Sequence, residues 1–394
     1  MNKTDIVILA GGKGSRIKKY LQKKPKPLIK INNFIFLDLL IKKICKYNFN
    51  KLYILAGYRG AQIKKKYHKK SFNFVKTEVI IEKKALGTAG SLSQLKNKIN
   101  NDFIVINGDT FFDIDLSRVI DLKLNKNEIF LSLVKNHNYK SNKKLTFLKL
   151  NSNNQISYNK NSILINGGIY KFNKFFLKQI IRKNYSLEND IVPKLINKKK
   201  VKGIVFDNFF IDIGTPKNLK SAKKSLIHYL TKPALFLDRD NTIIHDKGYV
   251  YKINELKIKK NFLNVLKNIN QTHIYIFIVT NQSGIGRGIF TEKQFINFQK
   301  VLKKKLCSLK IFIDDVQFCP FHEEAKLEIY RKKTNLRKPG NGMLLNLFQD
   351  WPLIKEKSIM IGDQISDEIS AKKTGIKFMN INDVNLKKLK KILN

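Results

Sequence analysis

The chain has 394 residues, which exceeds the usual size of a single hydrophobic core and predicts two domains. Hydrophobic residues make up 43% and charged residues 27%, a balance that supplies packed cores and excludes an intrinsically disordered chain. The net charge of +47 comes largely from lysines spread along the whole sequence, which favours a compositional bias over a nucleic-acid partner, although such a field attracts phosphorylated substrates.

The first predicted element is a strand over 5–10, and it begins without the apolar stretch and cleavage site of a signal peptide. No later segment approaches the roughly 20 apolar residues that span a bilayer. Three cysteines without paired spacing argue against a disulfide framework and favour a reducing compartment. The sequence therefore predicts a cytoplasmic protein without a membrane partner.

Short apolar runs rich in β-branched residues alternate with amphipathic helical stretches from the N-terminus onward. Further strands are predicted over 51–57, 75–82 and 103–109, and a helix over 36–47. This alternation predicts the α/β class, with a largely parallel sheet flanked by helices. Right-handed crossovers would place the loops after the strands at one edge of the sheet, where ligands collect.

Two later segments suggest a hairpin and a domain boundary. Polar, Asn-rich sequence around 141–161 predicts a hairpin that covers a sugar site. A helix predicted over 217–230 is followed by Pro233 and by a new apolar run over 234–238. The sequence thus predicts two Rossmann-like domains, 1–230 and 231–394.

A glycine-rich loop follows the first strand. Such a turn lets backbone N–H groups approach phosphate oxygens, and nearby cations add fixed positive charge. An ordinary structural turn is the alternative for this segment taken alone. The candidate phosphate-binding residues are Gly11, Gly12, Gly14 and Ser15, with Arg16 and Lys26 as catalytic cations.

Further motifs accompany this loop in a recognisable order: Pro25-Lys26-Pro27-Leu28, Leu86-Gly87-Thr88-Ala89-Gly90, Asn107-Gly108-Asp109, Asn166-Gly167-Gly168-Ile169-Tyr170 and Phe210-Ile211-Asp212-Ile213-Gly214-Thr215-Pro216. Together they resemble the sugar-1-phosphate nucleotidyltransferase family over about residues 5–225. The resemblance implies that a sugar 1-phosphate oxygen attacks the α-phosphorus of a nucleoside triphosphate, with charge neutralisation and alignment carrying catalysis.

The same resemblance implies roles for individual residues. Asp109 and Asp212 would hold Mg²⁺, a cation that prefers oxygen ligands. Gly11 and Gly87 would face the nucleobase, and Asn166, Gly168 and Glu188 would lie near the sugar. Glu188 has an equal alternative as a helix-capping residue. Many relatives carry a Glu-Lys pair before the hairpin, and here only Lys149 lies nearby.

A second chemical motif follows the predicted boundary. Asp238 and Asp240 lie two residues apart at the end of an apolar strand, and Thr280, Lys338 and Asp363 follow later in the chain. This order resembles the haloacid dehalogenase superfamily of phosphatases. The alternative, that these aspartates are only turn residues at strand ends, is much the weaker one once four motifs agree.

That resemblance implies a covalent mechanism. Asp238 would attack phosphorus to form an aspartyl phosphate, and Asp240 would serve as general acid and then base. Mg²⁺ would be held by Asp238, Asp363 and the backbone carbonyl of Asp240. Thr280 and Lys338 would bind the transferring phosphoryl oxygens.

Longer segments at 246–251, 280–288 and 319–322 resemble heptose-1,7-bisphosphate 7-phosphatases, with histidinol phosphatases as cousins. These proteins commonly carry a four-ligand zinc loop, of which this chain keeps Cys319 but has Phe321, Thr334 and Leu336 at the other positions. The sequence therefore predicts no structural zinc. Candidates for binding substrate phosphates in this domain are Asn281, Arg287 and Arg337.

Together the two resemblances predict one enzyme with small-molecule substrates. The second domain would remove the 7-phosphate of a heptose 1,7-bisphosphate, and the first would transfer a nucleotide, GMP from GTP as the first choice, to heptose 1-phosphate. ATP, CTP and dTTP stay open, as do the anomer and the oligomeric state. The alternatives are a hexose-1-phosphate nucleotidyltransferase fused to another sugar-phosphate or histidinol-phosphate phosphatase, and a first domain that is catalytically silent or binds nucleic acid.

Overall fold

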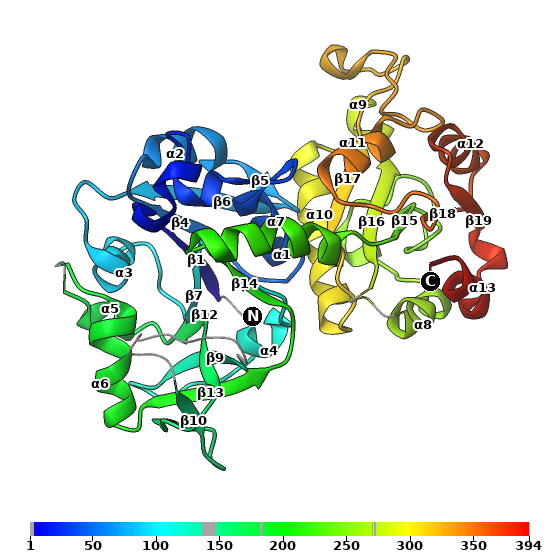
Figure 1. The fold of residues 1–394 in the computed structure, drawn as a ribbon. Coiled ribbons are helices and arrows are strands. Elements are labelled where there is room, and N and C mark those ends of the chain that lie inside the picture. The colour runs from blue at the N-terminus through cyan, green and yellow to red at the C-terminus, as the bar shows by residue number, and fades with distance from the viewer. Residues whose placement is uncertain (1–3, 136–146, 182–183, 270, 272, 394) are drawn as a thin grey trace. The chain divides into compact units, whose positions relative to one another are not determined.

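The computed structural model describes residues 4–135, 147–181, 184–269, 271 and 273–393. The chain divides into two compact units. The first comprises the residues up to Ile44 together with Phe49–Leu226, and the second comprises Cys45–Asn48 together with the residues from Ile227 onward. Each unit contains a sheet flanked by helices, which confirms the predicted α/β class (Figure 1).

The main sheet of the first unit has a parallel centre and antiparallel flanks. Its described strands follow the order β11-β10-β12-β7-β1-β4-β6-β5, and β9 pairs with both β12 and β13. The four neighbours from β7 to β6 run parallel, so their C-terminal ends meet at one edge. The strands are β1 (Asp5–Ala10), β4 (Leu52–Ala56), β5 (Ser71–Phe72), β6 (Val75–Ile81), β7 (Phe103–Asn107), β9 (Ile129–Lys135), β10 (Leu148–Leu150), β11 (Ile156–Tyr158), β12 (Leu164–Phe172) and β13 (Val201–Phe206).

Helices and short strands complete the first unit, and its last helix, α7 (Pro216–Leu230), continues past Leu226 into the second unit. Strand β8 pairs antiparallel with β14, outside the main sheet, and β2 pairs with β3. The predicted helix 36–47 ends two residues earlier, and the described part of the predicted hairpin is formed by β10 and β11; residues 141–146 of that prediction lie outside the described residues. These elements are α1 (Phe36–Cys45), α2 (Gly60–Tyr67), α3 (Gly87–Gly90), α4 (Leu116–Ile120), α5 (Phe176–Gln179), α6 (Val192–Asn197), α7 (Pro216–Leu230), β2 (Lys30–Ile31), β3 (Phe34–Ile35), β8 (Thr110–Phe112) and β14 (Phe210–Asp212).

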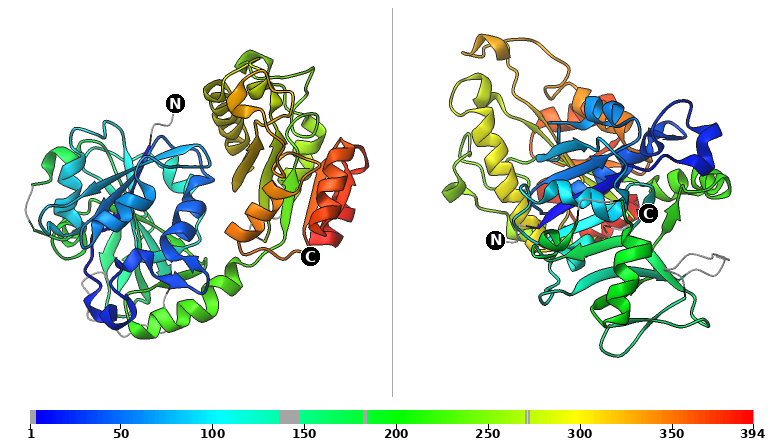
Figure 2. Two further views of the ribbon diagram at one scale, coloured as in Figure 1. Left: turned by 90° about the horizontal axis from the view of Figure 1, so that it is seen from above. Right: turned by 90° about the vertical axis from the view of Figure 1, so that its left-hand side faces the viewer.

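The second unit is built on a parallel sheet of order β17-β16-β15-β18-β19, covered on both faces. Apolar side chains of α8, α10 and α13 pack against one face, and those of α11 and α12 against the other. The left view of Figure 2 shows helices flanking this sheet. Such two-sided burial explains why β15 and β18 are apolar throughout. The elements are β15 (Ala234–Leu237), α8 (Lys260–Asn268), β16 (Tyr275–Asn281), α9 (Ser283–Gly286), α10 (Glu292–Ser308), β17 (Asp315–Cys319), α11 (Gly342–Asp350), β18 (Ile359–Gly362), α12 (Ile365–Thr374), β19 (Lys377–Asn380) and α13 (Leu386–Leu393).

None of the helices formed by the described residues is both long and apolar enough to cross a membrane.

A buried carboxyl at the start of β1 should make the stability of the first unit depend on pH. Asp5 is 1% exposed and accepts a hydrogen bond from Asn50 Nδ2 at 2.8 Å. Burial raises the pKa of Asp5 to about 6, against the opposing effect of that hydrogen bond. The folded state therefore binds this proton more tightly than the unfolded chain does, and stability falls as pH rises from about 4 through 6.

We expect Asp5→Asn to stabilise the protein at pH 7.5 by up to about 3 kcal/mol and to change little at pH 4. Thermal unfolding of both proteins at the two pH values measures this difference. Asp207→Asn, at a side chain that is 67% exposed and paired with Lys135, is the control and should show no such pH-dependent gain. An equal gain for Asp5→Asn at both pH values would contradict the assigned burial cost.

Candidate active sites

A cavity of about 620 Å³ lies at the C-terminal edge of the parallel strands in the first unit. Its walls come from the segments that follow β1, β6 and β7, from β12, and from the loop after β14. This is the edge at which ligands collect in open α/β sheets. The predicted site residues that line it are Gly11, Gly12, Arg16, Lys26, Gly87, Asp109, Asn166, Glu188 and Asp212.

Three predicted residues are not among the described lining residues of this cavity. Gly14 has a φ of +62°, and a Cβ there would lie 2.9 Å from the side chain of Leu21, so this position favours glycine. Ser15 is exposed and begins a short helical turn. Gly168, with a φ of +76°, packs against Asn107, a residue that does line the cavity.

A short antiparallel ribbon brings the two predicted metal ligands of the first unit together. Asp212 pairs with Thr110 in the β14–β8 register, and the backbone N–H of Ile213 donates to the carbonyl of Asp109 at 2.9 Å. The two aspartates therefore lie on two paired segments of the chain, and both line the cavity. Carboxylate oxygens so placed suit a divalent cation shared with phosphate.

Protein donors orient both carboxylates. Lys26, which is 6% exposed, places its Nζ 2.5 Å from Asp109 Oδ2. Asp212 accepts from the Gly214 backbone N–H at 2.7 Å and from Asn218 Nδ2 at 2.6 Å. Lys26 thus brings positive charge to the position where a phosphate and its cation would meet.

Glu188 is held at the cavity wall by three hydroxyl groups. Its carboxylate accepts from Thr88 Oγ1 at 2.8 Å, Ser186 Oγ at 2.9 Å and Tyr170 OH at 3.1 Å. The alternative role of Glu188, as a helix-capping residue, is filled by Asp190 instead. The backbone N–H of Ser186 donates to the Asp190 carboxylate at 2.7 Å. The motifs alone did not identify Thr88 or Tyr170 as partners of Glu188, since Thr88 comes from α3 and Tyr170 from β12, and only the tertiary fold brings them to Glu188.

A second cavity, of about 430 Å³, lies at the C-terminal edge of the sheet in the second unit. Asp238 follows β15 and Asp363 follows β18, and these strands are parallel neighbours in which the Asp238 backbone N–H donates to Ile361 O at 2.9 Å. Parallel pairing therefore explains why two residues far apart in sequence meet. The predicted site residues that line this cavity are Asp238, Asp240, Asn281, Arg337, Lys338 and Asp363.

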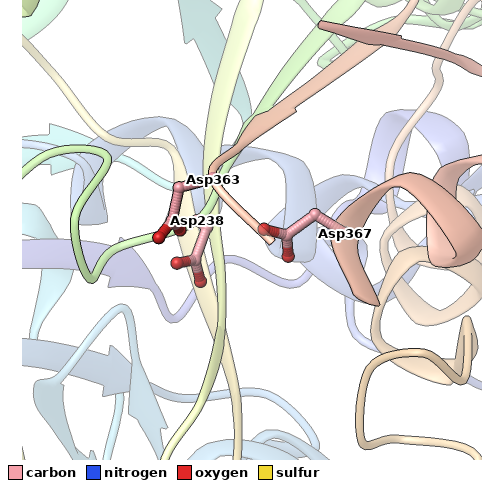
Figure 3. Close-up of side chains that lie close together, drawn as sticks. All are labelled: Asp238, Asp363 and Asp367. Carbon is pink, nitrogen blue, oxygen red and sulfur yellow. The ribbon is translucent and has the colours of Figure 1, made fainter. Parts of the chain in front are cut away.

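Three carboxylates form an acidic cluster in this cavity. Asp238, Asp363 and Asp367 each offer an oxygen within 4.8 Å of the others, and Figure 3 shows the first two side by side. Asp363 Oδ1 is buried and has no hydrogen-bond partner among the described residues. An unpartnered buried carboxylate oxygen is costly, so the cluster fits a divalent cation.

A buried lysine neutralises part of that charge. Lys338 is 4% exposed, and its Nζ lies 2.6 Å from both Asp238 and Asp367. Burial by itself would lower the pKa of Lys338, but the two carboxylates outweigh it and raise that pKa. Burial likewise raises the pKa of Asp238, while Lys338 opposes the shift. The pair holds a carboxylate beside a fixed cation, the arrangement a nucleophile toward phosphate needs.

Asp240 is held by Arg239 and Gln282, which the motif does not name, and by Thr280, which it does. Its Oδ1 accepts from Arg239 Nε at 2.9 Å, and its Oδ2 accepts from Gln282 Nε2 at 2.8 Å and Thr280 Oγ1 at 3.4 Å. Arg239 is 1% exposed and its guanidinium lies over the ring of Phe298. The signal for Arg239 was its position between two aspartates, but its burial could not be inferred locally.

The arginine predictions differ in outcome. Arg337 lines the second cavity, whereas Arg287 is not among its described lining residues and lies 3.9 Å from Glu324. At the zinc-loop positions, Phe321 and Leu336 pack against the core cluster that contains Cys319. Lys332 Nζ lies 4.1 Å from the Phe321 ring centroid. Apolar and cation–π contacts therefore surround Phe321 and Leu336, two of the positions that the sequence analysis compared with zinc ligands.

Comparison with known proteins assigns the two units separately. Residues 5–228 match the nucleotidyl transferase family, and residues 234–386 match the polynucleotide kinase 3 phosphatase family. The D-glycero-beta-D-manno-heptose-1,7-bisphosphate 7-phosphatase of Rhodopseudomonas palustris is 39% identical over 37% of this chain and 81% of its own length. The protein of that name from Haemophilus influenzae is 37% identical over 34% of this chain and 72% of its own length.

Among solved structures, HddC from Yersinia pseudotuberculosis is 28% identical, with a TM-score of 0.48, and the match covers 57% of this chain and 99% of that one. The family resemblances that the sequence motifs indicated are confirmed for both parts of the chain by the family matches and the 7-phosphatase relatives.

Proposed function

The chain belongs to the nucleotidyl transferase family and to the heptose-1,7-bisphosphate 7-phosphatase family, and from this premise we propose one enzyme that carries out two consecutive reactions. The second unit hydrolyses the 7-phosphate of D-glycero-D-manno-heptose 1,7-bisphosphate. The first unit transfers a nucleotidyl group, GMP from GTP, to the resulting heptose 1-phosphate. The product would be a nucleotide-activated heptose for surface polysaccharide, such as lipopolysaccharide.

The Asp238–Lys338 pair is the single observation that carries the phosphatase assignment. In the first step an oxygen of Asp238 forms a bond to phosphorus and the bond to the sugar oxygen breaks, with Asp240 giving its proton to that oxygen. Water then attacks the aspartyl phosphate while Asp240 takes a proton, which releases phosphate and restores Asp238. We assign the acidic cluster to Mg²⁺, which would neutralise phosphate charge when bound.

In the first unit the chain aligns and neutralises two anionic substrates. An oxygen of heptose 1-phosphate forms a bond to the α-phosphorus, and the bond to pyrophosphate breaks. Arg16 and Lys26 line the cavity and would stabilise the charge on the transferring group. Asp109 and Asp212 would hold Mg²⁺, which supplies charge neutralisation. Because nucleoside triphosphates are cytoplasmic metabolites, we place the enzyme in the cytoplasm.

The proposal is tested by supplying heptose 1,7-bisphosphate, Mg²⁺ and one nucleoside triphosphate at a time, while orthophosphate and nucleotide-sugar are followed together. We expect phosphate release with every triphosphate and nucleotide-sugar with GTP. Chelation by EDTA should abolish both products, and added Mg²⁺ should restore them. Faster hydrolysis of histidinol phosphate, or transfer to hexose 1-phosphate in preference to heptose 1-phosphate, would replace the proposed substrates.

A further inference from the structure

Gln364 lies between the candidate metal ligand Asp363 and helix α12, and the mechanism described above gives it no role. It lines the second cavity and directly precedes α12, which begins at Ile365. Its side-chain Nε2 donates to Asp363 Oδ2 at 2.6 Å. Hydrogen bonds to an ionised acceptor are shorter and stronger than neutral ones. Gln364 is therefore a firm partner of a candidate metal ligand, although its own side chain is exposed.

This hydrogen bond decides which oxygen of Asp363 stays open. Oδ2 is occupied by the Gln364 amide, whereas Oδ1 is buried and has no hydrogen-bond partner among the described residues. The carboxylates of Asp363 and Asp238 lie side by side in Figure 3, within the acidic cluster. Mg²⁺ demands a strict octahedral geometry and is usually held by one or two carboxylates. An Asp363 carboxylate that is anchored through one oxygen presents the other in a fixed direction, which suits this cation.

The backbone of Gln364 holds the third carboxylate of the cluster. Its N–H donates to Asp367 Oδ2 at 3.2 Å, and the Asp367 N–H donates to Gln364 O at 3.0 Å. Lys338 Nζ lies 2.6 Å from Asp367 Oδ1. Gly362 allows this approach, because a Cβ there would clash with the Asp367 carboxylate. Both oxygens of Asp367 are thus engaged by protein groups, while Asp363 Oδ1 stays open toward a cation.

We propose that Gln364 is a positioning residue for the magnesium site of the second unit, and that it acts on the cation through Asp363. The inference rests on the proposed Mg²⁺-dependent phosphatase and assigns a group that orients its metal ligand. Without the amide, the Asp363 carboxylate could rotate, and binding of the cation would have to restrict that rotation each time. Donors to metal-binding groups typically contribute about 10-fold to 100-fold in metal affinity or activity.

Gln364→Met tests this assignment, because methionine has a similar length and cannot donate a hydrogen bond. Orthophosphate release from heptose 1,7-bisphosphate by the full chain is followed over a Mg²⁺ series. We expect the Mg²⁺ concentration at half-maximal rate to rise by about tenfold or more, and the rate at saturating Mg²⁺ to stay within about twofold of the native value. Gln364→Ala should show the same shift, which separates loss of the donor from misplacement of the methionine.

A second measurement follows the cation without catalysis. Mg²⁺ is titrated calorimetrically into the full chain carrying Asp109→Asn, which weakens the site of the first unit, with and without Gln364→Met. The dissociation constant of the remaining site should rise by about tenfold or more. Gln349→Met, the same replacement at an exposed position of α11 outside the described cavity lining, is the matched control and should leave that constant unchanged.

The two measurements separate failure of the inference from failure of the proposed function. Unchanged Mg²⁺ dependence in both Gln364 variants overturns the inference while the phosphatase stands. A rate that falls equally at every Mg²⁺ concentration, with unchanged calorimetric affinity, also overturns it, because Gln364 would then act on the substrate. Native protein that hydrolyses no heptose bisphosphate, but whose Mg²⁺ affinity depends on Gln364, supports the inference and rejects the proposed substrate.

Discussion

Replacing Asp238 by Asn is expected to reduce phosphate release from heptose 1,7-bisphosphate by at least about 10³-fold, because an amide cannot form the aspartyl phosphate. Transfer of nucleotide to added heptose 1-phosphate should stay within about twofold of the native rate. The separation is expected because Asp238 lines the cavity of the second unit and not that of the first. Initial rates of orthophosphate and nucleotide-sugar formation, each from its own substrate, measure both effects.

Loss of folding must be distinguished from loss of the nucleophile. Lys338 keeps its contact with Asp367 at 2.6 Å when Asp238 is replaced, so its charge remains paired and a native-like melting temperature is expected. Glu368→Gln, an exposed neighbour on α12, serves as the matched control and should retain phosphatase activity. A folded Asp238→Asn protein that hydrolyses the bisphosphate at the native rate would show that the nucleophile has been misassigned.

The sequence was sufficient to locate the strand ends that carry the second site. Asp238 and Asp363 each follow an apolar run, and parallel pairing of β15 with β18 places them together. The third carboxylate, Asp367, lies four positions after Asp363, and the motifs did not assign it to the metal. Its role depends on α12 returning over the end of β18, a tertiary arrangement with no local signature.

Contacts between distant elements were the part that sequence patterns could not supply. Arg239 is buried because α10 brings Phe295 and Phe298 beneath its guanidinium, from more than fifty positions along the chain. In the first unit, β8 and β14 are three-residue strands, too short for the alternation that reveals a strand. Their pairing nevertheless joins Asp109 to Asp212.

Asp109→Asn is expected to reduce nucleotidyl transfer by at least about 10²-fold and to leave phosphate release from heptose 1,7-bisphosphate unchanged. An amide weakens the hold on a divalent cation, and it also leaves Lys26, whose side chain is 8% exposed, without the carboxylate that now lies 2.5 Å away. Both changes weaken the positive charge that stabilises the nucleotidyl group during its transfer. The measurement is pyrophosphate release with GTP and heptose 1-phosphate over a Mg²⁺ series.

The Mg²⁺ series distinguishes a lost ligand from a disturbed loop. A weakened cation site should shift half-maximal activity to higher Mg²⁺ and allow partial recovery there, whereas a misplaced Lys26 would lower activity equally at every concentration. Asp207→Asn, whose exposed carboxylate pairs with Lys135 outside the cavity, should follow the native curve. Because Asp109 and Asp238 line different cavities, each variant should lose one reaction and retain the other. A folded Asp109 variant that lost both would mean that the two units do not work as separate active sites.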